Sequence, residues 1–140
     1  MDLVPIGWLA KESGVKIPTI RYYEEIGLLP PPLRSEGNRR LYPREAARRL
    51  SFIRHARQLG FEVEDIRRLA ALAGDPGNPC GEAHTIACAR LHDIEDKIAR
   101  LAAQREELLR MIGQCPHGCV GDCGVIEILD DHAKCLHDSH

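Results

Sequence analysis

The fold is decided by residues 6–27, which read IGWLAKESGVKIPTIRYYEEIG. The apolar residues in the first half of this stretch fall on one face of a helix that would end at Gly14. Pro18 is tolerated in the first turn of a second helix, and Gly27 provides the C-terminal stop of that helix. Two short helices around a tight glycine turn predict a helix-turn-helix.

Turn residues dominate the segment that follows. Residues 28–42 contain three consecutive prolines and then the run Ser35-Glu36-Gly37-Asn38, which predicts a β-hairpin. Arg34, Arg39 and Arg40 flank the turn. A hairpin that follows a helix-turn-helix and carries cations predicts a wing that reaches the DNA backbone.

Further helices are predicted over residues 44–59, 63–73 and 82–112. The last is long and contains no proline or glycine. Its positions 84, 87, 91, 94, 98, 101, 105, 108 and 112 form a heptad seam, with polar interruptions at His84 and Arg105. So narrow an apolar stripe favours pairing with a second copy of the helix, and we expect a homodimer.

All six cysteines lie after residue 79. Three of them share one loop with a histidine, in the run Cys115-Pro116-His117-Gly118-Cys119-Val120-Gly121-Asp122-Cys123. Ligands of this kind and density favour a soft metal ion such as Zn, Cd, Pb, Hg or Cu(I). No signal peptide and no apolar run long enough to cross a bilayer are recognisable, so we expect a cytoplasmic protein without a membrane partner. In that compartment, thiols favour metal or redox chemistry over disulfides.

Cys80 directly precedes the long helix, whose N-terminal dipole stabilises a negative charge such as a thiolate. About 35 residues of mostly helical path, at roughly 1.5 Å each, separate it from Cys115 by some 50 Å. The two cysteines therefore cannot meet within one chain. An antiparallel dimer of the helix would place Cys80 of one protomer beside the loop of its partner, and metal would then bridge the subunits.

Other candidate ligands have a plain structural alternative. Cys88 lies inside the long helix, where core packing explains it better than ligation does, and His84 is explained as a polar interruption of the seam. The C-terminal tail is either a solvated, disordered segment or a second metal site composed of His132, Cys135, His137 and His140.

These patterns divide a mainly α-helical chain into five segments. We expect a winged helix-turn-helix DNA-binding domain over 1–74, a hinge over 75–81, a dimerisation helix over 82–112, a metal-binding loop with a short helix over 113–129, and a tail over 130–140. Residues 1–70 hold 13 Lys and Arg against 9 Asp and Glu, whereas residues 71–140 hold 6 against 12. The basic half suits DNA, with ordinary charge scatter as the alternative.

Five runs together resemble the MerR family of regulators. They are IGWLA at 6–10, TIRYYE at 19–24, GLL at 27–29, RRLY at 39–42 and FIRHARQLGF at 52–61. The TIRYYE run is highly specific, and the resemblance extends from residue 6 to about residue 129. It implies a winged helix, an antiparallel coiled-coil dimer and a C-terminal sensing loop.

The resemblance also implies a function. Family members act on promoter DNA with RNA polymerase, repress without effector, and activate by bending and untwisting the DNA when effector binds. Relatives that sense organic ligands append a larger effector domain than this chain has room for. An enzyme is disfavoured because a loop beside a coiled coil offers no evident cleft with an open metal position.

Cys80 bears on the metal, because divalent-ion sensors of the family carry cysteine at this position and Cu(I) sensors carry serine. The resemblance therefore implies Zn, Cd, Pb or Hg as the effector of a metal-resistance or efflux promoter. Cys115 and Cys123 match the family's two loop cysteines, whereas Cys119 and His117 depart from its simplest pattern and would expand the coordination or bind a second ion. The alternatives are a Cu(I)-responsive activator and a thiol or iron-sulfur redox sensor; a cluster requires four grouped thiolates, and the loop has three.

The candidate DNA-contacting residues lie on the second helix, on the wing and on the third helix. Tyr22 and Tyr23 are adjacent on a helix and face different ways, so one of them is expected in the core. The full set is Thr19, Arg21, Tyr22, Tyr23, Arg34, Asn38, Arg39, Arg40, Tyr42, Arg54 and His55.

Overall fold

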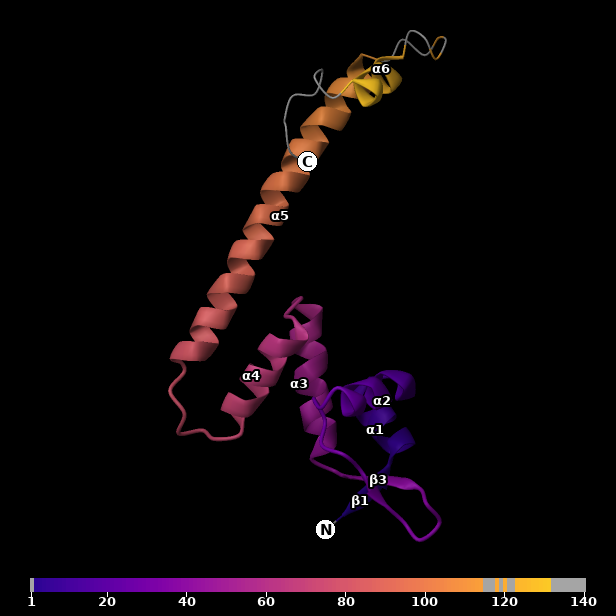
Figure 1. The fold of residues 1–140 in the computed structure, drawn as a ribbon, viewed down its shortest axis with the longest axis vertical. Coiled ribbons are helices and arrows are strands. Elements are labelled where there is room, and N and C mark those ends of the chain that lie inside the picture. Colours follow the sequence, from indigo (N-terminus) through magenta and orange to yellow (C-terminus); the bar gives the residue numbers. More distant parts are fainter. Residues whose placement is uncertain (1, 115–117, 119, 121–122, 132–140) are drawn as a thin grey trace. The chain divides into compact units, whose positions relative to one another are not determined.

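The protein is mainly helical in its computed structural model, which describes residues 2–114, 118, 120 and 123–131 (Figure 1). The contacts divide the chain into two units, residues 1–87 and 88–140. In chain order the elements are β1 (Leu3–Pro5), α1 (Ile6–Ser13), α2 (Ile17–Glu25), β2 (Leu33–Arg34), β3 (Arg40–Pro43), α3 (Ala46–Gln58), α4 (Val63–Ala73), α5 (Gly81–Gly113) and α6 (Gly124–Asp130).

The helix-turn-helix forms around the residues that predict it. Gly14 ends α1 in the left-handed conformation with a φ of 73°, a region that only glycine enters at little cost. Pro18 lies in the first turn of α2, where a backbone N–H has no helical partner to lose. Beyond α2, the carbonyl of Ile26 accepts a hydrogen bond from Arg67 Nη2 of α4 at 2.7 Å, so α4 holds the C-terminal end of α2.

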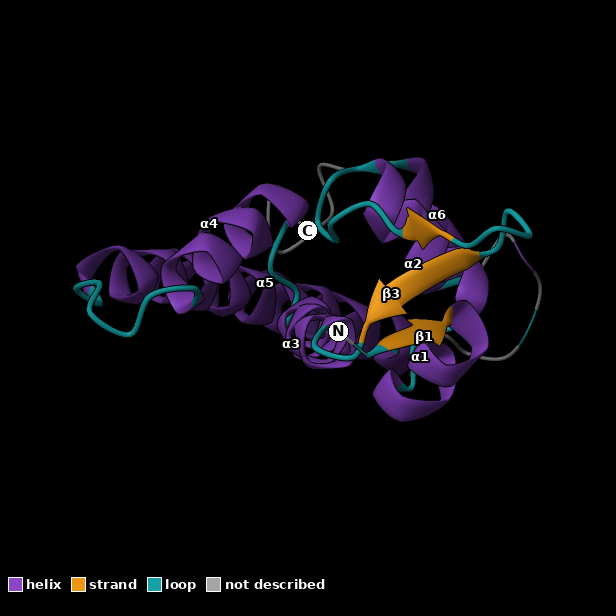
Figure 2. Cartoon of the chain, turned by 90° about the horizontal axis from the view of Figure 1, so that it is seen from below, coloured by secondary structure: helices purple, strands orange, loops and turns teal. Residues whose placement is uncertain are grey.

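Three antiparallel strands form a small sheet in the order β1-β3-β2 (Figure 2). Strands β2 and β3 make the predicted wing, with Leu33 opposite Leu41 and Arg34 opposite Arg40. Asn38 in the turn has a φ of 61°, which asparagine tolerates better than most residues do. The wing thus follows from its turn chemistry.

Strand β1 is absent from the sequence-based prediction. It has three residues, ends at Pro5, and pairs with β3 so that Val4 lies opposite Tyr42. So short a run has no readable alternation of apolar and polar residues, and only pairing with a distant strand defines it. The correction adds a third strand to the predicted hairpin.

The core of the first unit is built from all of its early elements. Its large, fully buried side chains are Leu9, Ile20, Leu29, Tyr42, Leu50, Ile53 and Ile66. They come from α1 to α4, from β3 and from the segment after α2. Burying them together holds α2 and the wing in one packed body.

The remaining helices follow the predicted ranges closely. Helix α3 is shorter than the predicted 44–59, α4 matches 63–73, and α5 extends the predicted 82–112 by one residue at each end. The linker before α5 is stabilised by hydrogen bonds of its own side chains. Asp75 Oδ1 accepts the N–H of Gly77 at 2.9 Å, and Asn78 Nδ2 donates to the carbonyl of Leu72 at 3.1 Å. The division between the two units falls inside α5, after residue 87.

The second unit contains most of α5 together with α6. Met111 and Ile128 are its buried large apolar side chains among the described residues. Glu107 is also buried, and it accepts a hydrogen bond from Arg110 Nη2 at 2.8 Å. No helix in the described part of the chain combines the length and the apolar character of a membrane span.

Candidate nucleic-acid interface and metal-sensing loop

Helix α2 turns one tyrosine to solvent and the other to the core. The side chain of Tyr22 is 50% exposed, whereas Tyr23 is 8% exposed and belongs to the core cluster. The prediction that one of the two is buried is therefore confirmed. Arg21, one residue earlier on the same helix, is exposed.

A cleft of about 480 Å³ lies between α2 and the wing. We call it the wing cleft; its lining residues are Pro5, Ile6, Arg21, Arg34, Asn38, Arg39 and Arg40. Five of these seven were predicted to contact DNA. No ion pair joins Arg21, Arg39 or Arg40 to a carboxylate among the described residues, so a phosphate would meet uncompensated guanidinium groups.

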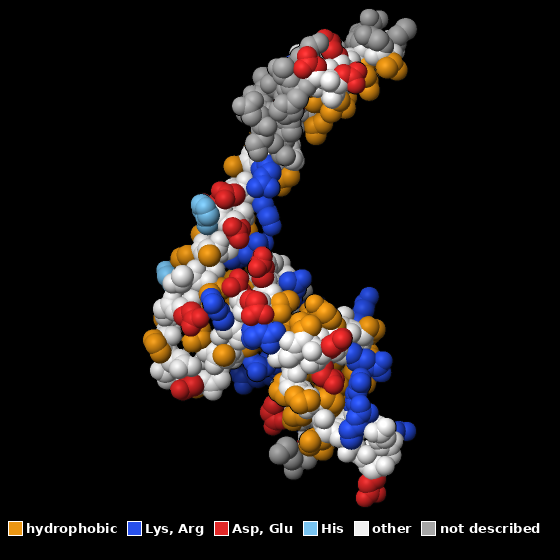
Figure 3. Space-filling model, in the orientation of Figure 1, with side chains coloured by type: hydrophobic (Ala, Val, Ile, Leu, Met, Phe, Trp, Pro, Cys, Tyr) orange, Lys and Arg blue, Asp and Glu red, His pale blue; other side chains and the backbone are white. Residues whose placement is uncertain are grey.

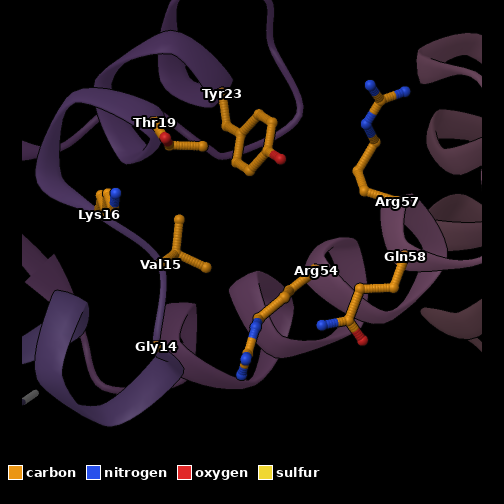
Figure 4. A pocket seen from close by; sticks show the side chains of 8 residues that line it. All are labelled: Gly14, Val15, Lys16, Thr19, Tyr23, Arg54, Arg57 and Gln58. Atoms are coloured by element: carbon orange, nitrogen blue, oxygen red, sulfur yellow. The ribbon is translucent and has the colours of Figure 1, made fainter.

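A second cleft, of about 400 Å³, lies between the N-terminal end of α2 and α3 (Figure 4). We call it the helix cleft; its lining residues are Gly14, Val15, Lys16, Thr19, Tyr23, Arg54, Arg57 and Gln58. Thr19, Tyr23 and Arg54 were predicted DNA contacts. Lys16 and Arg57 also line this cleft but were not among the predicted contacts. Arg57 follows Arg54 by three residues on a helix, a spacing that places both on one face.

Basic side chains gather on the edge of the first unit that contains α2 and the wing. Figure 3 shows Lys and Arg side chains in a column along this edge. Both clefts open among these cations. A surface with this charge and this helix geometry is suited to the phosphates and the major groove of duplex DNA.

Two predicted contacts lie elsewhere. Tyr42 is fully buried, and its hydroxyl donates to Glu24 Oε2 at 2.7 Å, so its side chain faces the core and not DNA. The alternation of a strand explains this position, because Leu41 and Pro43 on either side of it point the other way. His55 is exposed on α3 but lines neither cleft.

Tyr42 makes the stability of the folded protein depend on pH. Burial, together with the hydrogen bond to Glu24, raises the pKa of Tyr42 from 10.0 to about 12. A raised pKa means that the folded state favours the neutral phenol. The neutral phenol therefore adds on the order of 2–3 kcal/mol to the free energy of unfolding. This contribution is complete below pH 10 and is lost as the pH rises through about 12. An absorbance titration should show a tyrosine that ionises near pH 12, and this ionisation should be missing in Tyr42→Phe. A wild-type titration without an ionisation near pH 12 would contradict the assignment.

Arg21 provides a direct test of the interface. Replacing it by alanine removes an exposed cation from the wing cleft, and we expect DNA binding to weaken by about 1–3 kcal/mol with or without metal. Fluorescence anisotropy with labelled duplex DNA measures this. Lys97→Ala, an exposed cation of α5 outside both clefts, is the matched control and should bind as the wild type does.

The metal-ligand candidates fall into two regions. Cys80 is exposed and immediately precedes α5, where its carbonyl accepts the N–H of His84 at 3.0 Å. It also lines a cleft of about 320 Å³ whose walls include Phe52, Leu69 and Pro79. Cys80 is thus an accessible thiol at the start of the helix, as predicted.

The flanks of the cysteine loop meet closely. An ideal Cβ built on Gly124 would lie 2.7 Å from the Cβ of Gln114 and 3.2 Å from its carbonyl oxygen. Gln114 immediately precedes the loop, and Cys123, which is partly buried, caps the N-terminal end of α6. The α6 backbone is therefore seated against Gln114, the residue that follows α5, and this contact brings the two flanks of the loop together (Figure 1).

Several predicted ligands lie outside the described residues. They are Cys115, His117, Cys119, His132, Cys135, His137 and His140. Within the described residues, no group of three His, Cys, Asp or Glu side chains is arranged to hold a metal ion. Cys88 is exposed in the single chain, and its preference for core packing over ligation remains a prediction.

The fold and the cationic clefts define the class: this is a winged helix-turn-helix DNA-binding protein. Two family models match the chain, "MerR HTH family regulatory protein" over residues 4–72 and "MerR, DNA binding" over residues 47–111. The chain belongs to the MerR family of transcription regulators, within its heavy-metal-responsive branch.

Relatives and solved structures agree with this placement. The HTH-type transcriptional regulator ZntR of Escherichia coli K12 is 41% identical over 133 residues, which cover 92% of this chain and 94% of that protein. CueR of Salmonella typhi is 36% identical over 129 residues, with 92% and 91% covered. The crystal structure of PbrR691 from Ralstonia metallidurans CH34 in complex with lead(II) has a TM-score of 0.80, at 36% identity, and the match covers 90% of this chain and 98% of that one.

Proposed function

We propose that this protein represses a metal-resistance or efflux promoter without metal and activates it when a divalent soft ion, Cd, Pb, Zn or Hg, binds between its subunits. One observation carries the proposal: Gly124 is seated against Gln114 at the base of the cysteine loop. Cys115 follows Gln114 and Cys123 precedes Gly124 in the sequence. Neighbouring residues are only about 3.8 Å apart along the chain, so closing the base supports a chelate between Cys115 and Cys123.

The exposed seam of α5 supports the dimer. Leu91, Ile98, Leu101, Leu108 and Ile112 are each more than half exposed in the single chain. An apolar stripe of this length on one helix favours burial against another surface, and its heptad spacing suits a second copy of α5. In an antiparallel pair, the start of one α5 lies beside the end of the other.

That pairing supplies the third thiolate. Cys80 is exposed at the start of α5, and the loop follows the end of α5. The metal site we propose contains Cys115 and Cys123 of one protomer and Cys80 of its partner, twice per dimer, with Cys119 and His117 as further ligands or as ligands of a second ion. Thiolates suit soft cations, and the lead(II) bound to the PbrR691 relative is such a cation.

The DNA-binding surface supports the regulatory half of the proposal. Metal binding would change how the two protomers of a dimer are held together, and each protomer contacts DNA through its own α2 and wing. Moving the two DNA-binding domains relative to each other would bend and untwist the promoter between them, which RNA polymerase then reads. The energy for that distortion comes from the difference in metal affinity between the two states.

A Cu(I)-responsive activator is the second candidate, favoured by the 36% identity with CueR. It differs in one respect that is testable, because a Cu(I) site needs two thiolates from the loop and none from Cys80.

Metal titration of the reduced apo-protein under anaerobic conditions tests the proposal. We expect thiolate-to-metal absorption to saturate with Cd, Pb, Zn or Hg at one ion per loop, and competition to rank these ions above Cu(I). Preferential binding of Cu(I) would favour the copper-responsive alternative, and visible colour in the purified protein would favour an iron-sulfur cluster.

A further inference from the structure

A hydrogen bond joins the wing to α2, the helix that we expect to face DNA. The Tyr42 hydroxyl donates to Glu24 Oε2 at 2.7 Å, between residues 18 apart in the chain. Tyr42 belongs to β3, the central strand of the sheet, and Glu24 belongs to the last turn of α2. The bond therefore links α2 to the wing, the two elements between which the wing cleft lies.

Glu24 lies close to the cations of that cleft. Arg21 precedes it by three residues on α2, a spacing that places the two side chains next to each other. Arg40 precedes Tyr42 by two residues, so both side chains leave the same face of β3. Burial and the hydrogen bond to Glu24 raise the pKa of Tyr42, whereas the positive charges of Arg40 and Arg21 act in the opposite direction and lower it.

A carboxylate in this position competes with DNA. An ion pair between Glu24 and Arg21 or Arg40 would cancel one positive charge of the wing cleft, and DNA affinity depends on how many phosphates the protein neutralises. Yet neither arginine forms an ion pair within the described residues. Instead, Glu24 accepts the hydrogen bond of a fully buried phenol, whose position is set by core packing.

We propose that Tyr42 is a positioning residue for DNA binding: its hydroxyl holds the Glu24 carboxylate on the core side and leaves Arg21 and Arg40 available for phosphates. This inference rests on the DNA-binding part of the proposed function and is independent of the metal. It gives a role at the interface to a side chain that contacts no DNA itself.

Binding of a fluorescein-labelled duplex DNA of arbitrary sequence, measured over a series of KCl concentrations, tests the proposal, because the phosphate contribution does not depend on sequence. We expect Tyr42→Phe to weaken binding about three- to tenfold at low salt and to lower the salt slope by about one, since Glu24 then pairs with an arginine. Adding Glu24→Gln to Tyr42→Phe should restore both the affinity and the slope. A role in folding alone would not be rescued in this way.

Both variants lack the same hydrogen bond, so their comparison holds even where both are less stable than the wild type. Equal weakness of Tyr42→Phe and the double variant overturns the inference. Arg39→Ala tests the surface itself: weak binding by Arg39→Ala with unchanged binding by Tyr42→Phe overturns this inference alone. Unchanged binding by both overturns the interface, and the inference with it.

Discussion

Cys80→Ser is expected to lower the affinity for divalent soft ions by more than about 100-fold while leaving apo-protein binding to DNA unchanged. Loss of a thiolate that contacts the metal should exceed the roughly 10- to 100-fold cost of losing an outer partner. Cys80 lies outside both the wing cleft and the helix cleft, so we expect DNA binding to be unchanged. Competition against a chromophoric chelator measures the metal affinity, and anisotropy measures DNA binding.

Mixed dimers sharpen this test. Chains with Cys80→Ser keep an intact loop, and chains with Cys115→Ser and Cys123→Ser keep Cys80. If the site is shared between subunits, co-refolding the two variants restores one complete site per heterodimer, although each homodimer has none. A mixture that binds no more metal than its two components would rule out the shared site. Cys88→Ser, which alters an exposed thiol within α5, is the matched control and should bind metal as the wild type does.

Gly124→Ala is expected to weaken metal binding about tenfold or more and to destabilise the second unit by about 1–3 kcal/mol. The added Cβ would lie 2.7 Å from the Cβ of Gln114 and 3.3 Å from its carbonyl carbon, so the α6 backbone must move away from α5. That movement opens the base of the cysteine loop. Metal titration and thermal unfolding of the apo-protein measure the two effects.

Gly118→Ala is the control for this prediction. Gly118 lies within the loop, and a Cβ added there meets no atom of the described residues within 4 Å. It should therefore leave metal affinity near the wild-type value. Equal effects of the two substitutions would mean that loop flexibility, and not the seating of α6, controls binding.

The sequence by itself predicted most of the local structure. Gly14 and Gly27 end the first two helices because glycine adopts positive φ without a steric cost, and such signals act through the nearest residues. The seam of α5 and the clustered thiols are equally local, and so is the TIRYYE run that identifies the family. The metal ligands all remain sequence-based predictions: Cys80, Cys115, His117, Cys119 and Cys123.

Tertiary structure decided which side chains are available to DNA. Tyr42 looked like a contact residue in a basic segment, but pairing between β1 and β3 and the core beneath them bury it. Lys16 joined Arg54 and Arg57 in one cleft only when α2 packed near α3. Local sequence determines backbone conformation through short-range sterics and periodicity, whereas exposure depends on contacts between residues far apart in the chain, and no local pattern encodes those.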